Sequence, residues 1–534
     1  MKKTQRNLSK ALAFCLTLLM TLGLFGGTTA FAAVSPTSTG AITVSNVEEG
    51  VTVSAYRLMG VNVNENGQPQ EPVYTWVNEV ADWVRTNYPR YIGNSGDNSV
   101  QEAFGTATAD DIAAFYDKLA AAIKTTTSPL GITAAGTCTG SGEIENLTMG
   151  NYLILIEDGM RVYRPSAVNL VPEWNDNANE WQMSDAAVTV KSSEPGITKT
   201  VKAPGTETGK DADNANIGDT VTFDIIADVP RFPANAISKN YAISDILPAG
   251  LTFTEGSIRV YGVSGTGETE LVNNGTTYTQ SAARPNSKGG STFTLTFTYD
   301  NISSYEKIHV TYSAILNGNA VLGEAGNPNH AYLDYTNNPY SENNWGGNDD
   351  DTATVYTYGL DITKVDKDDQ KPLSGAEFEL YASAENAANG GNKIAFFKVS
   401  DGVYRKATGS DNTVTNTLAV GSNGKLTIKG LDEGTWYLKE TKAPENYNLL
   451  TSPISVTITD ADNGTLDGRV SGAAANAEDE DAALVTLTVE NDDGFQLPVT
   501  GGMGTLLFTA AGIVLMGAAV ILLVVVLKKK KAGN

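Results

Sequence analysis

The chain has 534 residues, with 37 Lys and Arg against 61 Asp and Glu, and a formal net charge of −24. This length is too great for one hydrophobic core and fits about three or four domains. The acidic balance excludes a nucleic-acid partner, because phosphates require a basic face. Two cysteines exclude a disulfide-dense scaffold and a cysteine-based zinc site, and two histidines leave little material for histidine-dependent hydrolysis. We expect no cofactor and no bound metal.

The N-terminus has the order of a secretory signal peptide. Basic side chains within the first ten positions precede an apolar run from Ala11 to Phe25, and Ala30-Phe31-Ala32 follows as a small-x-small cleavage site. The alternative is an uncleaved membrane anchor, but the apolar run is short for a span. We therefore expect residues 1–32 to be removed on export.

Three features follow one another at the C-terminus. A pentapeptide LPVTG precedes residues 505–527, which carry no charge and are long enough to cross a bilayer, and residues 528–534 begin with four lysines that favour the cytoplasmic side. This order resembles the LPxTG sorting signal of Gram-positive surface proteins, which implies cleavage by a sortase between the threonine and the glycine. The alternative is a single-pass membrane protein with a chance pentapeptide. The residues of the signal are Leu497, Pro498, Val499, Thr500 and Gly501.

Maturation at both ends leaves residues 33–500. The removed ends hold eight Lys and Arg and no Asp or Glu, so 29 basic residues remain against 61 acidic ones, a balance of −32. Such a surface resists self-association without a specific link. Only Cys138 survives, so an intrachain disulfide is impossible and we expect a free thiol.

The mature chain divides into three expected domains, at residues 33–191, 195–357 and 358–495. Short segments of period-two alternation recur in all three and predict strands. In the first domain, apolar residues at helical spacing predict a helix over 108–123, with Thr108 and Asp111 as a capping pair, and a second helix over 77–88. The predicted fold is mainly β: tandem immunoglobulin-like β-sandwiches, the first with helical insertions.

Two of these domains open with the same tripeptide, Ile-Thr-Lys, at residues 197–199 and 362–364. Side chains two positions apart on a strand point to the same face. If the isoleucine faces the core, the lysine does too, and a buried lysine without a partner is costly. Lys199 and Lys364 therefore require buried partners.

The third domain supplies candidate partners for Lys364. Residues 437–447 read YLKETKAPENY, and Asn491 ends the last strand. The first segment resembles the E-box of Cna-B-type pilin domains, with Asn446 where glycine is commonest; both residues tolerate a left-handed turn. With these segments, the signal peptide and the sorting signal taken together, the whole precursor resembles the shaft, or backbone, pilins of sortase-assembled Gram-positive pili.

The resemblance implies an internal isopeptide bond in the third domain. Lys364 would attack the side-chain amide of Asn491 and expel ammonia, with Glu440 as the acid that transfers protons. Burial favours this chemistry, since it lowers the pKa of a lysine and raises that of a carboxyl group. The alternative is a buried Lys–Glu ion pair beside a bystander asparagine.

The middle domain resembles Cna-A-like pilin domains around residues 241–251, YAISDILPAGL. That likeness implies a second bond, made by Lys199 with Asp245 as the acid. The amide is Asn329 or, as the alternative, Asn337, which lie on one face of a predicted strand. These asparagines can instead serve only loop backbone groups.

A lysine for joining one subunit to the next is expected near the end of the first domain. Relatives carry a motif resembling WxxxVxVYPK, and here the text is WQMSDAAVTVK, ending at Lys191. The V-x-V and the lysine are present, whereas Tyr-Pro is absent and the tryptophan is farther away. We expect Lys191 to attack the acyl group of Thr500 of another copy, with Lys202 as the fallback; the alternative is an ordinary exposed lysine.

The sequence therefore predicts a structural subunit and not an enzyme. A pilus sortase would polymerise it, a housekeeping sortase would attach the fibre to peptidoglycan, and its partners would be further copies of itself and minor or tip pilins. The pilus would support adhesion, with host surface ligands as further candidate partners. The alternative is a monomeric wall-anchored adhesin that binds a host protein or glycan. Acidic runs such as residues 349–351 do not have EF-hand spacing, so we expect them to be solvated.

Overall fold

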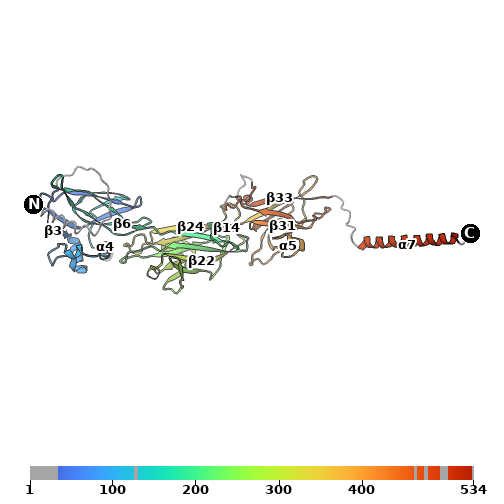
Figure 1. Ribbon diagram of the computed structural model, residues 1–534, viewed down its shortest axis with the longest axis horizontal. Helices are drawn as coiled ribbons and strands as arrows, with labels where there is room; N and C mark the ends of the chain where they lie inside the picture. Colours follow the sequence, from blue (N-terminus) through green and yellow to red (C-terminus); the bar gives the residue numbers. More distant parts are fainter. Residues whose placement is uncertain (1–33, 126–129, 462–465, 474–478, 494–502, 532–534) are drawn as a thin grey trace. The chain divides into compact units, whose positions relative to one another are not determined.

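The computed structural model describes residues 34–125, 130–461, 466–473, 479–493 and 503–531. The chain forms two compact units: the first consists mainly of residues up to Tyr356, and the second mainly of residues from Thr357 onwards. The first unit contains the first and middle domains, and the second contains the third domain. The chain is mainly β, as expected, and the individual domains can be followed by colour in Figure 1.

The first domain combines four small sheets with helices. One sheet has the strand order β3-β2-β6-β8 with β4 beside β2; the others are β11-β1-β5, β10-β9 and β12-β7. The strands are β1 Thr39–Ser45, β2 Thr52–Val63, β3 Pro69–Trp76, β4 Gly136–Thr139, β5 Gly142–Thr148, β6 Gly150–Glu157, β7 Val162–Tyr163, β8 Ser166–Leu170, β9 Pro172–Asn175, β10 Glu180–Met183, β11 Ala186–Thr189 and β12 Ser192–Ser193, and the helices are α2 Asn78–Asn87, η1 Pro89–Tyr91, α3 Glu102–Gly105 and α4 Ala109–Lys124.

The helix α4 forms where the apolar spacing predicts it. Thr108 is its N-cap, and the Thr108 hydroxyl accepts a hydrogen bond from the backbone N–H of Asp111 at 3.1 Å. Its apolar face, which includes Phe115 and Leu119, is buried in the core of the domain. Figure 1 shows α4 on one side of the strands. The predicted second helix is also present, as α2.

The middle domain is a sandwich of two six-stranded sheets. One has the order β13-β15-β22-β18-β19 with β17 beside β22, and the other has the order β14-β24-β23-β16-β21-β20. Figure 1 shows β22 and β24 in the two layers. The elements are β13 Ile197–Lys202, β14 Ala212–Asn214, β15 Thr220–Asp228, β16 Tyr241–Ile246, β17 Leu251–Phe253, β18 Arg259–Ser264, β19 Gly267–Glu270, β20 Tyr278–Ala283, η2 Pro285–Ser287, β21 Gly290–Phe297, η3 Tyr299–Asn301, β22 Lys307–Leu316, β23 Asn327–Tyr335 and β24 Gly347–Tyr356.

The third domain is a smaller sandwich. Its five-stranded sheet has the order β27-β28-β30-β25-β33, and its four-stranded sheet has the order β29-β26-β31-β32. The first strand, β25, pairs in parallel with the last, β33. The elements are β25 Tyr358–Asp366, β26 Glu377–Tyr381, α5 Ala384–Asn389, β27 Phe396–Ser400, β28 Val403–Lys406, β29 Leu418–Ala419, β30 Lys425–Leu431, β31 Gly434–Lys442, β32 Ile454–Ile458, α6 Asp479–Ala482 and β33 Leu484–Asn491.

The C-terminal helix α7, Met503–Lys531, covers the expected span and the four lysines after it. Its segment Ala511–Lys528 has a mean hydropathy of 2.7 and is long and apolar enough to cross a membrane. The expected signal peptide, residues 1–32, and the sorting pentapeptide, residues 497–501, lie outside the described residues.

Candidate functional site

The two Ile-Thr-Lys strands bury their lysines, as the alternation predicts. In β13, Ile197 and Lys199 face the core, and Lys199 is only 1% exposed; in β25, Lys364 is completely buried beside Ile362. Each lysine therefore contacts buried groups inside its own sandwich, and the two sets of contacts differ.

The structure brings Lys199, Asp245 and Asn329 together; we call these three residues the middle-domain trio. Lys199 comes from β13 in one sheet, whereas Asp245 and Asn329 come from β16 and β23 in the facing sheet. The register pairs Asp245 with Ala331, so Asn329 lies two positions along β23 on the same face. The Lys199 ammonium contacts the Asp245 carboxylate, and all three side chains are buried.

Burial controls the protonation of the middle-domain trio. It lowers the pKa of Lys199, against the opposing charge of Asp245, and it raises the pKa of Asp245, against the opposing charge of Lys199. Both shifts favour the neutral pair, in which the proton has passed from the amine to the acid. A neutral amine is the nucleophilic form of a lysine.

A fourth side chain, Tyr312 of β22, lies among these three. Its hydroxyl oxygen is 3.1 Å from Lys199 Nζ and accepts a hydrogen bond from Asn329 Nδ2 at 2.6 Å. It also lies near the Asp245 carboxyl group, and its hydroxyl lowers the pKa of that acid against the larger effect of burial. Tyr312 was not predicted from the sequence. Alternation indicates that it lies on the inward face of a strand, but the sequence does not show which strands pair with that strand.

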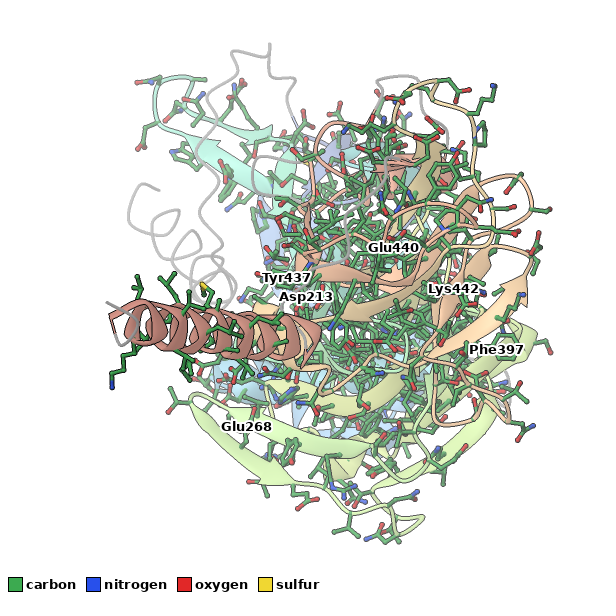
Figure 2. All side chains as sticks on the ribbon, turned by 90° about the vertical axis from the view of Figure 1, so that its right-hand side faces the viewer. Asp213, Glu268, Phe397, Tyr437, Glu440 and Lys442 are labelled. Atoms are coloured by element: carbon green, nitrogen blue, oxygen red, sulfur yellow. The ribbon has the colours of Figure 1, made fainter. Side chains whose placement is uncertain are left out.

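In the third domain, Lys364, Glu440 and Asn491 form the corresponding third-domain trio. Lys364 and Asn491 lie on the adjacent strands β25 and β33 of one sheet, and Glu440 on β31 comes from the other. Asn491 Nδ2 donates to Glu440 Oε2 at 3.0 Å and to the backbone oxygen of Asn448 at 2.5 Å. Figure 2 labels Glu440 on its strand with Tyr437 and Lys442.

Burial also favours the neutral form of the lysine in the third-domain trio. Lys364 Nζ donates to the backbone oxygen of Val489 at 2.9 Å. Burial lowers its pKa to about 8, and the charges of Glu440 and Glu490 oppose that shift. A substantial neutral fraction is therefore present near neutral pH. Asn446, in the turn after Glu440, has φ of 71°, as its place in the E-box predicts.

Both trios leave the same kind of atom without a partner. Among the described residues, each acid and each amide has one buried oxygen that accepts no hydrogen bond. Such atoms are costly to bury. A proton on the acid would supply a donor where there are otherwise only acceptors, which is the state that polarises an amide carbonyl. The four atoms are Asp245 Oδ1, Asn329 Oδ1, Glu440 Oε1 and Asn491 Oδ1.

The alternative amide, Asn337, lies elsewhere. Its Nδ2 donates to the backbone oxygen of Gly159 in the first domain. Tyr335 likewise donates to the backbone oxygen of Met160 at 2.5 Å. The end of β23 therefore holds the two domains of the first unit together, while Asn329 is the asparagine beside Lys199.

The expected joining lysine, Lys191, is exposed and follows β11. It lines a pocket of about 460 Å³ together with Tyr116 of α4, Pro165 and Pro233. No hydrogen bond or ion pair engages the Lys191 ammonium within the described part of the chain. The fallback, Lys202, instead pairs with Asp224 at 2.7 Å.

A buried aspartate that the sequence analysis did not identify sets one wall of this pocket. Asp117 Oδ2, on α4, accepts hydrogen bonds from the backbone N–H of Asn235 at 2.8 Å and from its side chain at 3.1 Å. The Tyr340 hydroxyl donates to Asp117 Oδ1. The loop that carries Pro233 is therefore attached to α4 of the first domain.

The acidic run at residues 349–351 has a structural role where solvation was expected. Asp349 Oδ2 accepts a hydrogen bond from the backbone N–H of Ile197 at 2.9 Å, and Asp351 Oδ2 accepts one from the backbone N–H of Lys199 at 2.7 Å. These carboxylates satisfy backbone donors on the edge of β13. Within the described residues, no cluster of acidic, histidine or cysteine side chains is arranged to hold a metal.

Comparison with protein families identifies three segments. Residues 217–339 match the Gram-positive pilin backbone subunit 2, Cna-B-like domain; residues 359–470 match the SpaA prealbumin-like fold domain; and residues 490–533 match the LPXTG cell wall anchor motif. The middle domain, which was expected to be Cna-A-like from the residues around Asp245, therefore matches a family described as Cna-B-like.

Individual relatives agree with these matches. The chain is 25% identical to the trypsin-resistant surface T6 protein of Streptococcus pyogenes serotype M6, over 94% of this chain and 97% of that protein. It is 28% identical to the fimbrial subunit type 1 of Actinomyces viscosus, over 56% of this chain and 59% of that protein. The solved T6 backbone pilin shares the fold, with a TM-score of 0.56, 20% identity and coverage of 87% of this chain and 99% of that one.

Proposed function

We propose that a pilus sortase joins copies of this chain, a Gram-positive backbone pilin with an LPXTG cell-wall anchor, covalently from Thr500 of one copy to Lys191 of the next. In this step the sortase cleaves the Thr500–Gly501 bond and holds the threonine as an acyl group. The Lys191 amine attacks that carbonyl, and the sortase is released. This chain is the substrate, and the completed fibre is attached to peptidoglycan.

The surroundings of Lys191 support its role as acceptor. The side chain is exposed, has no ion pair among the described residues, and lies beside a pocket with largely apolar walls. The segment Leu497-Pro498-Val499 is apolar too, so the pocket suits the residues that precede the reacting threonine. Of all the observations, this joint occurrence of an anchor motif and a free lysine beside an apolar pocket carries the proposal.

The two trios further support internal isopeptide bonds, Lys199 to Asn329 and Lys364 to Asn491. In each, the neutral amine attacks the amide carbon while the protonated acid gives its proton to the amide oxygen. The acid then removes a proton from the attacking nitrogen and gives one to the leaving nitrogen. Ammonia departs as the carbonyl re-forms, and the proton on the carbonyl oxygen returns to the acid, which is thereby regenerated. Each bond forms once per chain. The word trypsin-resistant in the name of the Streptococcus relative accords with such cross-links.

The polymer is tested in a Gram-positive host that carries a pilus sortase. Wild-type cell-wall extracts should give a ladder of high-mass species that survives boiling in detergent. Lys191→Ala should reduce the ladder to single copies, while the control Lys202→Ala should leave it intact because Lys202 is engaged by Asp224.

A ladder that persists in Lys191→Ala excludes Lys191 as the link. A wild-type chain that remains single in this host excludes polymerisation, and favours the monomeric adhesin. Internal bonds are tested separately by the intact mass of the recombinant mature chain, which should fall short of the sequence mass by two molecules of ammonia. A mass equal to that of the sequence rules them out.

A further inference from the structure

We infer that Tyr312 is a catalytic residue of the middle-domain bond: its hydroxyl holds the leaving nitrogen of Asn329 and passes to it a proton from Asp245. This inference rests on the proposed bond between Lys199 and Asn329. It adds a fourth group to the middle-domain trio, one that takes part in expelling ammonia.

The hydroxyl oxygen of Tyr312 contacts both nitrogens that take part in forming the proposed bond. The Tyr312 hydroxyl lies 2.6 Å from Asn329 Nδ2, the nitrogen that must leave, and 3.1 Å from Lys199 Nζ, the nitrogen that must attack. Asp245, the acid, contacts the same Lys199 ammonium, and the Tyr312 hydroxyl lies near enough to lower the pKa of the Asp245 carboxyl group. A hydroxyl can accept and donate at once. Tyr312 therefore lies beside all three groups between which protons must move.

The third domain also has a group that accepts a hydrogen bond from the leaving amide nitrogen. There, the amide nitrogen of Asn491 donates to the backbone oxygen of Asn448 and to Glu440 itself. The backbone oxygen fixes the amide so that its carbonyl oxygen is left for the acid, and the acid contacts the leaving nitrogen directly. In the middle domain the Tyr312 oxygen accepts the hydrogen bond from the amide nitrogen instead of a backbone oxygen.

The proton transfers balance without any further reactant. After Lys199 has attacked and Asp245 has taken a proton from its nitrogen, Asp245 is again protonated. Tyr312 then gives its hydroxyl proton to the leaving nitrogen while it receives one from Asp245. Ammonia departs, the carbonyl re-forms, and the proton on its oxygen returns to Asp245. Tyr312 ends as it began.

The environment of Tyr312 suits a relay that stays neutral. Burial, with the neighbouring Asp245 charge, raises its pKa well above the ordinary range, so the phenol does not ionise. Its ring is fixed independently of the hydroxyl, because it stacks on Phe223 at 5.4 Å between centroids and meets Phe293 edge-on at 5.0 Å. A phenylalanine can therefore occupy the same position.

The experiment uses the mature chain with Lys364→Ala, so that only the middle-domain bond changes its mass. Protein from a short cell-free synthesis is sampled over time, and the fraction that has lost ammonia is measured by intact mass. We expect Tyr312→Phe to slow this loss about 100-fold, the usual scale for one proton-transfer group. The matched control is Tyr241→Phe, another fully buried tyrosine of this domain, whose hydroxyl contacts only the backbone oxygen of Ala227 at 3.4 Å.

The outcomes are separable. If Tyr312→Phe loses ammonia as fast as the parent and Tyr241→Phe, Tyr312 has no role in the reaction. If the Lys364→Ala parent itself keeps its full mass, the middle-domain bond is absent and the proposed function fails at this site. Near-ultraviolet circular dichroism reports folding. Should Tyr312→Phe not fold, fluorotyrosine at position 312 keeps the ring and hydroxyl but acidifies the phenol: a relay predicts a changed rate, and an unchanged rate overturns the inference.

Discussion

The role of Glu440 distinguishes two interpretations of the third-domain trio. In one, Glu440 transfers protons while Lys364 and Asn491 form a bond; in the other, Glu440 only forms an ion pair with Lys364. Glu440 is 3% exposed and holds Asn491 Nδ2, while a second donor, the backbone N–H of Leu450, also reaches its Oε2 at 2.9 Å. A glutamine would keep this shape and lose the ability to exchange protons. The two readings therefore predict different results for one substitution.

We predict that Glu440→Gln prevents the third-domain bond and leaves the middle-domain bond intact. Intact mass should show the loss of one ammonia instead of two. Closing a loop of about 130 residues is worth about 5 kcal/mol, so the Tm of this domain should fall by about 10–20 °C. A Glu440→Gln chain that still loses two ammonias contradicts the role of Glu440.

A second residue-scale prediction concerns His309. Its Nε2 and Nδ1 lie 3.0 Å from Asp224 and 3.0 Å from Glu268. The hydrogen bond with Asp224 is the largest influence and raises the pKa of His309; burial opposes this shift, and Glu268 adds to it. Lys202, which also pairs with Asp224, and the ring of Tyr261 are the other neighbours.

Because the pKa of His309 is higher in the folded state, its stabilising effect is complete below the unfolded value and disappears as pH rises through the folded value. The Tm difference between wild type and His309→Gln should therefore be larger at about pH 5.5 than at about pH 8.5. The same difference at both pH values would contradict the assignment.

Much of each trio was predictable from strand alternation, and one part was not. The Ile-Thr-Lys pattern alone indicates that Lys199 and Lys364 are buried. The acids Glu440 and Asp245 came from resemblance to known motifs, whereas Asn329 came from the face that alternating residues of one predicted strand share. Tyr312 could not be found this way, since its contact with Lys199 depends on the order of β13, β15 and β22 in a sheet, which no local pattern encodes.

At the scale of elements, the edge of β13 is closed by side chains instead of by a further strand. β13 pairs with β15 on one side. On the other side, carboxylates of β24 accept the backbone N–H groups of Ile197 and Lys199, and an isolated bridge joins Val201 to Lys210. This clasp by Asp349 and Asp351 fixes the strand that carries Lys199. These contacts were not predicted from the sequence, because an acidic run is usually solvated and because the contacting residues lie 152 positions apart in the chain.

We predict that Asp351→Ala lowers the free energy of unfolding of the middle domain by about 1–2 kcal/mol, since the N–H of Lys199 loses its acceptor. The neighbouring Asp350→Ala is the control, because Asp350 is exposed and alternation points it to the opposite face of β24. Thermal unfolding of the two variants measures the difference. Equal effects would show that only the charge of the run matters.

At the scale of the whole molecule, the first domain differs from the other two. No lysine is buried within residues 34–125 and 130–191, so the described part of this domain has no counterpart of Lys199 and Lys364. Of the two lysines on α4, Lys118 is exposed and Lys124 is only half-buried, where it contacts Glu157 and the Tyr56 hydroxyl. We therefore expect the domains to differ in resistance to proteolysis.

We predict that trypsin cuts the wild-type chain first within the first domain and leaves a fragment containing the middle and third domains. In the double variant Lys199→Ala, Lys364→Ala that fragment should be degraded at least about tenfold faster, because each bond removed costs several kcal/mol. Gel analysis with N-terminal sequencing identifies the cuts. Equal survival of the fragment with and without the two lysines would contradict both bonds.

The parallel pairing of β25 with β33 has a mechanical consequence. The chain enters the third domain at one end of this pair and leaves at the other, and the register runs from Gly359 beside Leu484 to Asp366 beside Asn491. Tension along the fibre would therefore load all the hydrogen bonds of the pair in shear, so they must break together instead of unzipping one by one. A bond from Lys364 to Asn491 would carry that load from β25 directly into the end of β33, and the rest of the sandwich would stay folded under no strain.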